Sequence, residues 1–353
     1  MKIYINNKEY QLTDLESFIS KNPKYSKLVK FIQNWRIGKQ TFKFQTSGST
    51  GKPKEISITK NQIISSVLAT KKALGLDQED KVLICLNPEY IATTMMTARC
   101  LILNLDMYII EPSANPFKMI DAEIKIDFAS FAPLQVEAIL DNNQANKLES
   151  IRNILVGGAP LSANLISQLS ALNTNIYQSY GMTETVSHIA LMNLKTDDCF
   201  NTIGGIEIQQ DNRQCLTIKG AVTNDLWVQT NDVVELINPT KFRWLGRADN
   251  IINSGGVKVF PETLEALAID ILKQNNFQNS FFFYGQKNER FGEIIGLIFE
   301  KNKPKKTILD SLNNSIINRF SKYHIPKTIT TVNAFCRTES GKIKRIETIE
   351  SLD

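Results

Sequence analysis

Between residues 56 and 180, short apolar runs alternate with longer stretches in which apolar residues recur every three or four positions. Short runs of this kind are typical of buried strands, and the longer period is typical of helices packed on one face. The stretches between the runs are long enough for crossover helices, so the pattern predicts a doubly wound, mostly parallel sheet. The expected strands are Ile56 to Ile58, Lys81 to Leu86, Met107 to Ile110, Ile126 to Phe131, Ile151 to Val156 and Asn175 to Ser179.

The clearest helix start lies at Thr59. Gln62 follows three residues later, which completes a capping-box pattern, and Ile63, Val67 and Leu74 continue at helical spacing. This stretch predicts an amphipathic helix directly after the first strand of the series.

The pattern changes after residue 200. Short alternating runs broken by Asn, Asp, Gly and Pro predict a small antiparallel β region up to about residue 247. A Gly-rich turn then precedes a helix expected from Pro261 to Lys273. A chain of 353 residues is longer than a single hydrophobic core usually accommodates, so we expect an α/β chain of two domains. We expect residues 1–247 to form a large domain and residues 248–353 to form a small, mobile α+β domain.

Composition narrows the class of protein. Apolar residues make up 42% and charged residues 22%, as in ordinary globular proteins. The most apolar stretch, Tyr90 to Ile110, is interrupted by Arg99 and Asp106, so we interpret it as a helix followed by a core strand and not as a membrane span. The N-terminus lacks a secretory pattern, and the expected compartment is the cytoplasm. The net charge of +5 is spread without a basic stripe, so we expect neither nucleic acid nor membrane as a partner.

The densest chemical signal is a run of glycines, hydroxyls and lysines that ends just before the first strand, TSGSTGKPK. Small residues let backbone N–H groups approach an anion, and hydroxyls and lysines add donors and positive charge. A Walker P-loop is excluded because only two residues separate the first two glycines and Pro53 follows Lys52. The run predicts a phosphate-binding loop, with a Ser/Gly surface turn as the alternative. Its candidate residues are Thr46, Ser47, Gly48, Ser49, Thr50, Gly51 and Lys54.

This run resembles the phosphate-binding loop of the adenylate-forming superfamily, which includes acyl-CoA synthetases, luciferases and peptide-synthetase adenylation domains. Four further motifs follow in the order of that family, from YGMTE at residue 180 to RTESGKIKR at residue 337. The resemblance implies that Tyr180 stacks on adenine beside Gly181, that Thr183 contacts the α-phosphate, and that Glu184 helps to hold Mg²⁺. The adenine-side turn is Gly157, Gly158 and Ala159, for which a plain strand-to-helix connection is the alternative.

The same resemblance assigns roles near the expected domain boundary. Asp232 and Arg247 match the residues that contact the ribose, although Asn231 stands where the family usually has glycine. Asp249 matches the interdomain hinge. The loop that lines the thiol tunnel corresponds to Ser254, Gly255 and Gly256, and Lys342 to the adenylation lysine, whose ammonium stabilises in-line transfer at phosphorus.

The implied activity is ATP-dependent ligation of a carboxylic acid to coenzyme A, with ATP, Mg²⁺ and coenzyme A as co-substrates. The stretch Tyr180 to Leu191 resembles the o-succinylbenzoate–CoA ligases of menaquinone biosynthesis. The candidate acyl-pocket residues are Tyr90, Thr93, Thr94 and His188, the last being either a substrate contact or a core histidine.

Three alternatives remain open at this point: a ligase for another aryl or short-chain acid, an enzyme that loads a carrier protein, and an adenylate-binding regulatory protein without turnover. Only about 45 residues precede the phosphate loop, fewer than most members of the superfamily carry. A shortened leading part would leave apolar surface of the large domain uncovered. We therefore expect a second copy of the chain to cover it in a homodimer.

Overall fold

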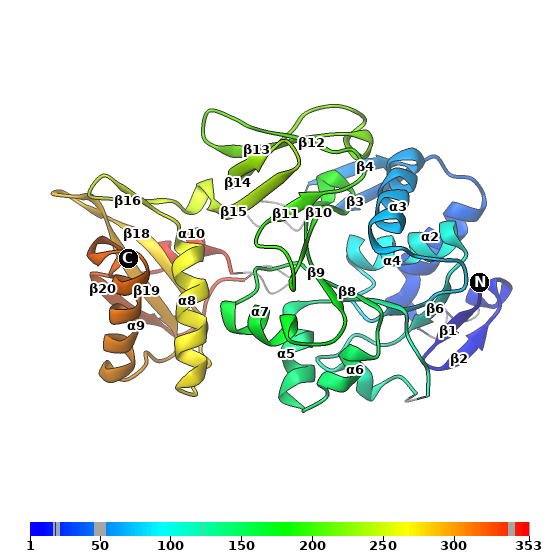
Figure 1. The fold of residues 1–353 in the computed structure, drawn as a ribbon, viewed down its shortest axis with the longest axis horizontal. Coiled ribbons are helices and arrows are strands. Elements are labelled where there is room, and N and C mark those ends of the chain that lie inside the picture. The colour runs from blue at the N-terminus through cyan, green and yellow to red at the C-terminus, as the bar shows by residue number, and fades with distance from the viewer. Residues whose placement is uncertain (17, 19–21, 46–53, 122, 338–342, 353) are drawn as a thin grey trace.

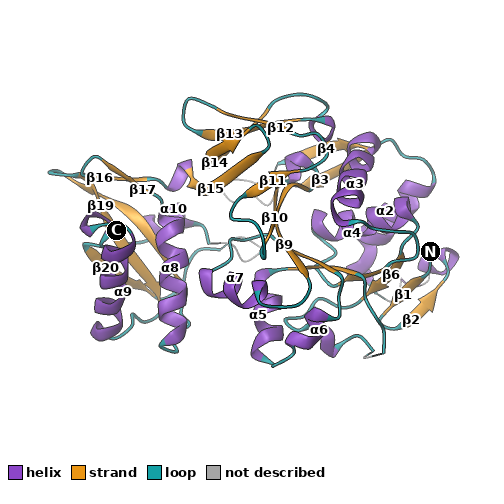
Figure 2. Ribbon diagram, in the orientation of Figure 1, coloured by secondary structure: helices purple, strands orange, loops and turns teal. Residues whose placement is uncertain are grey.

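A computed structural model describes residues 1–16, 18, 22–45, 54–121, 123–337 and 343–352. Figures 1 and 2 show a large unit built on one long sheet and a second unit built on a smaller sheet, which lies at the left of both views. The predicted α/β fold class is confirmed. Within the described residues, no helix is long and apolar enough to cross a membrane.

The centre of the large sheet is parallel. Its strands run in the order β9, β8, β7, β5, β6 and β1. All but the first of the strands expected between residues 56 and 180 lie here, and β1 at the N-terminus was missed. The bounds are β1 Ile3–Ile5, β5 Lys81–Ile84, β6 Asp106–Ile109, β7 Phe128–Phe131, β8 Asn153–Val156 and β9 Asn175–Gly181.

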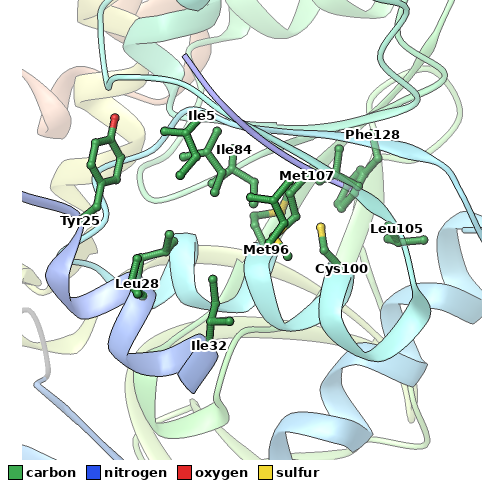
Figure 3. Close-up of a cluster of buried hydrophobic side chains, with 14 of the residues drawn as sticks. Ile5, Tyr25, Leu28, Ile32, Ile84, Met96, Cys100, Leu105, Met107 and Phe128 are labelled. Atoms are coloured by element: carbon green, nitrogen blue, oxygen red, sulfur yellow. The ribbon is translucent and has the colours of Figure 1, made fainter. Parts of the chain in front are cut away.

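Alternate residues of these strands enter two separate cores, which makes the sheet doubly wound. In β5, Val82 and Ile84 pack in a core with helices α2 and α4, while Leu83 packs in a core with α5, α6 and α7. Figure 3 shows the first core, in which Leu28 and Met96 point toward the sheet. The helices are α2 Ser26–Arg36, α3 Lys60–Leu74, α4 Ile91–Leu103, α5 Pro133–Asp141, α6 Ala145–Glu149 and α7 Ala163–Ser170.

The predicted antiparallel region continues the same sheet beyond β9, so the large sheet has 13 strands in total. Its two edge strands are β12 and β2. Backbone pairing from β9 through β10, β11, β15 and β14 brings segments far apart in the sequence together. The bounds are β2 Lys8–Tyr10, β10 His188–Asn193, β11 Phe200–Thr202, β12 Glu207–Gln210, β13 Cys215–Lys219, β14 Val228–Asn238 and β15 Lys241–Arg247.

The strand expected at Ile56 to Ile58 exists but belongs elsewhere. As β4 (Glu55–Thr59) it pairs antiparallel with β3 (Thr41–Gln45) in a separate two-stranded sheet. Its placement in the parallel sheet was therefore wrong, because an apolar run predicts burial but not the identity of the neighbouring strand. The capping box at the start of α3 is confirmed, since the backbone N–H of Thr59 donates to Gln62 Oε1 at 2.9 Å.

The second unit begins directly after the large sheet ends. Its five-stranded sheet packs against α8 and α9 around a core that includes Leu264, Phe283 and Leu312. The predicted helix at Pro261 is α8. The bounds are β16 Ile252–Ser254, β17 Val257–Val259, β18 Phe281–Asn288, β19 Gly292–Glu300, β20 Thr328–Val332, α8 Pro261–Gln274, α9 Lys306–Arg319 and α10 Arg345–Glu350.

Candidate active site

A tyrosine at the end of β9 meets an aspartate of β14. Tyr180 Oη donates a hydrogen bond to Asp232 Oδ2 at 2.7 Å, and its ring packs against Phe200 and Phe242. Burial, together with the neighbouring Asp232 carboxylate, raises the pKa of Tyr180 well above its usual value, so the phenol stays protonated and donates. The structure therefore brings together two of the predicted nucleotide residues that lie 52 positions apart in the sequence.

The Asp232 carboxylate is buried and has two further partners. Trp244 Nε1–H donates to its Oδ1 at 3.3 Å, and Arg247 Nη1 lies 3.7 Å from the same oxygen. Trp244 was not predicted, because it lies on the following strand, β15, and no local pattern signals its contact with Asp232. With these three partners, Asp232 has a fixed orientation at the place where the ribose is expected.

The predicted hinge residue Asp249 joins the same network. It lies in the short helix Ala248–Asn250 between the two sheets, and its Oδ2 accepts from Arg247 Nη2 at 2.7 Å. Asn231 Nδ2 donates to both carboxylate oxygens of Asp249, at 3.0 and 3.2 Å. Arg247 thus bridges Asp232 and Asp249. Asn231 had been noted only as a departure from the family's glycine, and its contact with Asp249 was missed.

Two of the predicted glycines lie where a side chain would collide. A Cβ on Gly157 would lie 2.3 Å from Ser179 Oγ, and a Cβ on Gly181 would lie 2.2 Å from the backbone oxygen of Ser187. Gly158 has a φ of +94°, a conformation that side-chain-bearing residues rarely adopt. The turn at residues 157–159 therefore packs closely on the Ser179 side chain, and the end of β9 packs closely on the backbone of Ser187.

The segment after β9 forms a short helical turn, Thr183–Thr185, on which Glu184 is exposed. The described residues contain no cluster of three or more His, Cys, Asp or Glu side chains suited to a metal ion. A single exposed carboxylate is nevertheless compatible with Mg²⁺ that arrives on ATP, because this ion keeps several waters and needs few protein ligands.

Val186, which directly follows this turn, has strained backbone. Its φ is +67° and its ψ is −51°, and the N–H of Ser187 donates to the oxygen of Thr185 at 2.7 Å. A three-residue turn of this hand is rare and strained, especially for a β-branched residue. The strain lies between the predicted Mg²⁺ residue and the predicted acyl-pocket residue His188.

A buried polar cluster lies on the other side of that turn, around Arg99 of α4. Arg99 Nη2 donates to Thr70 Oγ1 at 3.3 Å and to Ser187 Oγ at 3.1 Å. Thr70 Oγ1 donates its own proton to the oxygen of Ser66, so His188 Nε2, 3.1 Å away, must be the donor of the bond between them. His188 Nδ1 then accepts from Ser187 Oγ at 3.4 Å.

His188 is neutral in this cluster. Burial, and then the positive charge of Arg99, lower its pKa well below 6.5. The Arg99 guanidinium is therefore the charged member of the cluster. It is only 2% exposed, its Nε has no partner among the described residues, and none of the acidic side chains described there forms an ion pair with it. Burial lowers its pKa to about 10.

Sequence reasoning had noted Arg99 only as an interruption of an apolar stretch. That interruption was the available signal, because α4 is buried on two faces: Met96 and Cys100 enter one core, while Met95 and Ala98 enter another. A lone charge in a helix that is buried on both sides is costly and points to a ligand.

The other predicted acyl residues lie on the first turn of the same helix. Tyr90 is at its N-terminal boundary and 43% exposed, while Thr93 and Thr94 are buried. Thr93 Oγ1 donates to the backbone oxygen of Asn87 at 2.7 Å, which ties the helix start to the preceding loop.

The predicted thiol-tunnel residues lie away from this network. Ser254 to Gly256 form the turn between β16 and β17, and the N–H of Gly255 donates to the oxygen of Phe291 at 3.1 Å. In Figure 1 this hairpin is at the far end of the second unit, well separated from β9.

Two predicted elements cannot be placed. Thr46 to Gly51 of the phosphate loop and the adenylation lysine Lys342 lie outside the described residues. Lys54 is described and is exposed just before β4. Arg337 and Ile343, which flank the segment containing Lys342, form an antiparallel bridge.

Comparison with known proteins gives concordant results. Residues 43–211 match the family model described as AMP-binding enzyme. The 2-succinylbenzoate–CoA ligase of Listeria monocytogenes serotype 4b is 24% identical over 340 residues, covering 89% of this chain and 70% of the relative. The corresponding ligase of Staphylococcus epidermidis is 26% identical over 332 residues, covering 85% and 67%.

Solved structures agree with these matches. An AMP-forming acyl-CoA synthetase/AMP-acid ligase II-like protein from Dyadobacter fermentans is 38% identical, with a TM-score of 0.61 and coverage of 94% of this chain and 95% of that one. The o-succinylbenzoate CoA synthetase of Bacillus subtilis, bound to its acyl-adenylate intermediate, has a TM-score of 0.76 at 22% identity, with coverage of 86% and 68%, and supports the fold. This chain therefore belongs to the AMP-binding enzyme family.

Proposed function

We propose that this AMP-forming acid–CoA ligase acts on o-succinylbenzoate and produces o-succinylbenzoyl-CoA for menaquinone biosynthesis, with ATP, Mg²⁺ and coenzyme A as co-substrates. The names of the curated relatives support this acid, and so does the resemblance of Tyr180 to Leu191.

The observation that carries the choice of acid is the buried Arg99 guanidinium. o-Succinylbenzoate has two carboxylates, of which one is joined to coenzyme A and the other stays free. A free carboxylate would supply the anion that Arg99 lacks among the described residues, and a buried guanidinium binds carboxylates strongly. Benzoate and acetate have only the carboxylate that reacts, so they would leave this charge unpaired.

In the first half-reaction, an oxygen of the acid's carboxylate attacks the α-phosphorus of ATP and pyrophosphate leaves. Tyr180 would lie against adenine beside the Gly157 turn, and Asp232 and Arg247 would bind the ribose hydroxyls. Thr183 would contact the α-phosphate, and Glu184 would contribute a carboxylate to the Mg²⁺ that accompanies ATP. This step depends mainly on positioning and charge stabilisation, to which the phosphate loop and Lys342 would contribute.

In the second half-reaction, the thiol of coenzyme A attacks the acyl carbon of the adenylate and AMP leaves. We propose that residues 248–353 rotate about Asp249 between the two steps, which withdraws Lys342 and presents Ser254 to Gly256 to the adenylate. Such a rotation is needed because Ser254 to Gly256 lie far from β9 in this arrangement.

Pyrophosphate release with a panel of acids tests the substrate. We expect o-succinylbenzoate to exceed benzoate and acetate by at least tenfold, and Arg99→Met to remove most of that preference, since a buried charged hydrogen bond contributes about 1.5–3 kcal/mol. Arg99→Lys should recover part of it, because the charge is kept and the planar fork is lost. Equal release from all three acids would contradict the assignment.

The adenylation role of Lys342 needs a separate experiment. Lys342→Ala should suppress pyrophosphate release while largely sparing thioester formation from supplied acyl adenylate. Equal loss of both half-reactions would show that this lysine does not act specifically in the first.

A further inference from the structure

A polar contact that the family resemblance does not supply joins the large sheet to the hinge. Asn231 of β14 donates from its amide to both carboxylate oxygens of Asp249, at 3.0 and 3.2 Å. We propose that Asn231 is a positioning residue that holds Asp249 in the present domain arrangement and so favours the adenylation half-reaction over thioester formation. This inference rests on the hinge role proposed for Asp249.

A hydrogen bond from Arg213 fixes the orientation of the Asn231 amide. Arg213 Nη1 donates to Asn231 Oδ1 at 3.1 Å, and an amide oxygen that accepts there must leave its NH₂ group facing Asp249. Arg213 is itself held by Asp211, whose Oδ2 accepts from Arg213 Nε at 3.0 Å. Asn231 is therefore preorganised to donate to the hinge carboxylate.

The contact also lies next to the predicted ribose site. Asn231 precedes Asp232 on the same strand, and Arg247 bridges the two aspartates, at 2.7 Å to Asp249 and 3.7 Å to Asp232. A backbone rotation at Asp249 would carry its carboxylate away from β14 and break its bonds to Asn231 and Arg247 together. The cost of leaving the present arrangement is therefore set partly by Asn231.

Other contacts hold the second unit in the same arrangement. Lys273 of α8 pairs with Glu137 of α5 at 2.7 Å, and Asp270 accepts from the backbone N–H of Asn164 at 3.1 Å. These contacts are partly exposed and each contributes little. The bonds of Asn231 and Arg247 to the Asp249 carboxylate are therefore a sizeable part of what holds the second unit in this arrangement. The glycine usual in the family at the position of Asn231 has no side chain to make this contact.

The test measures both half-reactions for Asn231→Ala and Asn231→Gly: pyrophosphate release from ATP and o-succinylbenzoate, and thioester formation from supplied acyl adenylate and coenzyme A. We expect the ratio of thioester formation to adenylation to rise about threefold to tenfold, the range for a partly exposed charged hydrogen bond. Arg213→Met should move the ratio in the same direction by less. Asn238→Ala is the matched control, because this asparagine lies on the same strand and bonds locally to Thr240.

A double-mutant cycle with Asp249→Ala identifies the contact itself. If Asn231 acts through Asp249, adding Asn231→Ala to Asp249→Ala should change the ratio no further. An Asn231→Ala enzyme with an unchanged ratio, or with equal loss of both half-reactions, would overturn the inference. In that case a shifted ratio in Asp249→Ala alone would keep the proposed hinge, whereas no shift there would remove the hinge as well.

Discussion

Replacing Arg99 by methionine should leave the stability of the folded protein nearly unchanged while it impairs the recognition of a dicarboxylic acid. The guanidinium is almost fully buried, and burial lowers its pKa from 12.5 to about 10. At about 1.4 kcal/mol for each pH unit, keeping it charged costs the folded state about 3 kcal/mol. Because the folded-state pKa is the lower one, this cost is fully present below pH 10 and vanishes as the pH rises past 12.5.

The substitution also removes favourable contacts. The hydrogen bonds to Thr70 and Ser187, 3.3 and 3.1 Å long, would be lost at about 1.5 kcal/mol each, the low end for a charged donor, together with a weak contact to Met96 Sδ. Neither hydroxyl would be left without a partner, because Thr70 still donates to Ser66 and both still bond to His188. The gain of about 3 kcal/mol and the loss of about 3 kcal/mol nearly cancel, so Arg99→Met should be close to neutral, as is often found when buried ionic groups are replaced by apolar ones.

Thermal and denaturant unfolding at pH 7.5 would measure this balance, with an expected change in Tm of no more than a few degrees in either direction. Saturating o-succinylbenzoate should then stabilise the wild type, by about 2.7 kcal/mol at 100 times Kd, and have little effect on Arg99→Met. Arg319→Met, at the exposed end of α9, is the control and should change stability by less than about 1 kcal/mol. A loss of more than 2 kcal/mol in Arg99→Met would refute the reasoning, since the guanidinium would then be a structural requirement.

Three further substitutions test other parts of the structure. Because the folded-state pKa of His188 lies well below 6.5, the wild type should lose stability as the pH falls below 6.5, and His188→Gln should flatten that loss in unfolding curves between pH 5 and 7.5. Arg345→Met leaves the carboxylate of Glu265 buried without its cation, 2.6 Å away, and should cost about 3–5 kcal/mol by denaturant unfolding. Gly181→Ala places a Cβ 2.2 Å from the backbone oxygen of Ser187 and should cost about 1–3 kcal/mol and most of the pyrophosphate release.

Each of these has a result that would count against it. If His188→Gln lost as much stability below pH 6.5 as the wild type, protonation of this imidazole would not be the cause of that loss. Stability recovered by adding Glu265→Gln to Arg345→Met would confirm the buried pair, while no recovery would assign the loss to packing against Phe282. Full pyrophosphate release from Gly181→Ala would show that β9 can move away from the turn before β10 at no cost.

Much of the fold could be predicted because local pattern determines it. Short apolar runs located five of the parallel strands, and the Thr59 and Gln62 pair located the start of α3. Strand neighbours could not be predicted in the same way. β4 has the same kind of apolar run as β5 but, within the described residues, pairs with β3 in a separate sheet, because pairing depends on chain segments that no local window contains.

The site shows the same division. Family motifs singled out Tyr180 and Asp232, but their contact joins β9 and β14, which three other strands separate in the order of the sheet, so no local pattern signals it. Trp244 belongs to no motif and Asn231 departs from one, and the contacts of both depend on strand register and on the direction of the side chain. The predicted roles of Lys342 and of the phosphate loop stay predictions, since those residues lie outside the described part of the chain.

The two ends of the site differ in a way that bears on binding energy. Asp232 already has a phenol, an indole and a guanidinium as partners, so a ribose bound as proposed would have to compete with bonds that exist before it arrives. Arg99 has no anionic partner among the described residues, so an acid with a second carboxylate would bring the one that it lacks. A neutral ester in place of that second carboxylate would leave the guanidinium unpaired and still keep the shape of the acid. The affinity lost on esterification should therefore exceed that lost by removing a ribose hydroxyl, because only the first change leaves a buried charge unpaired.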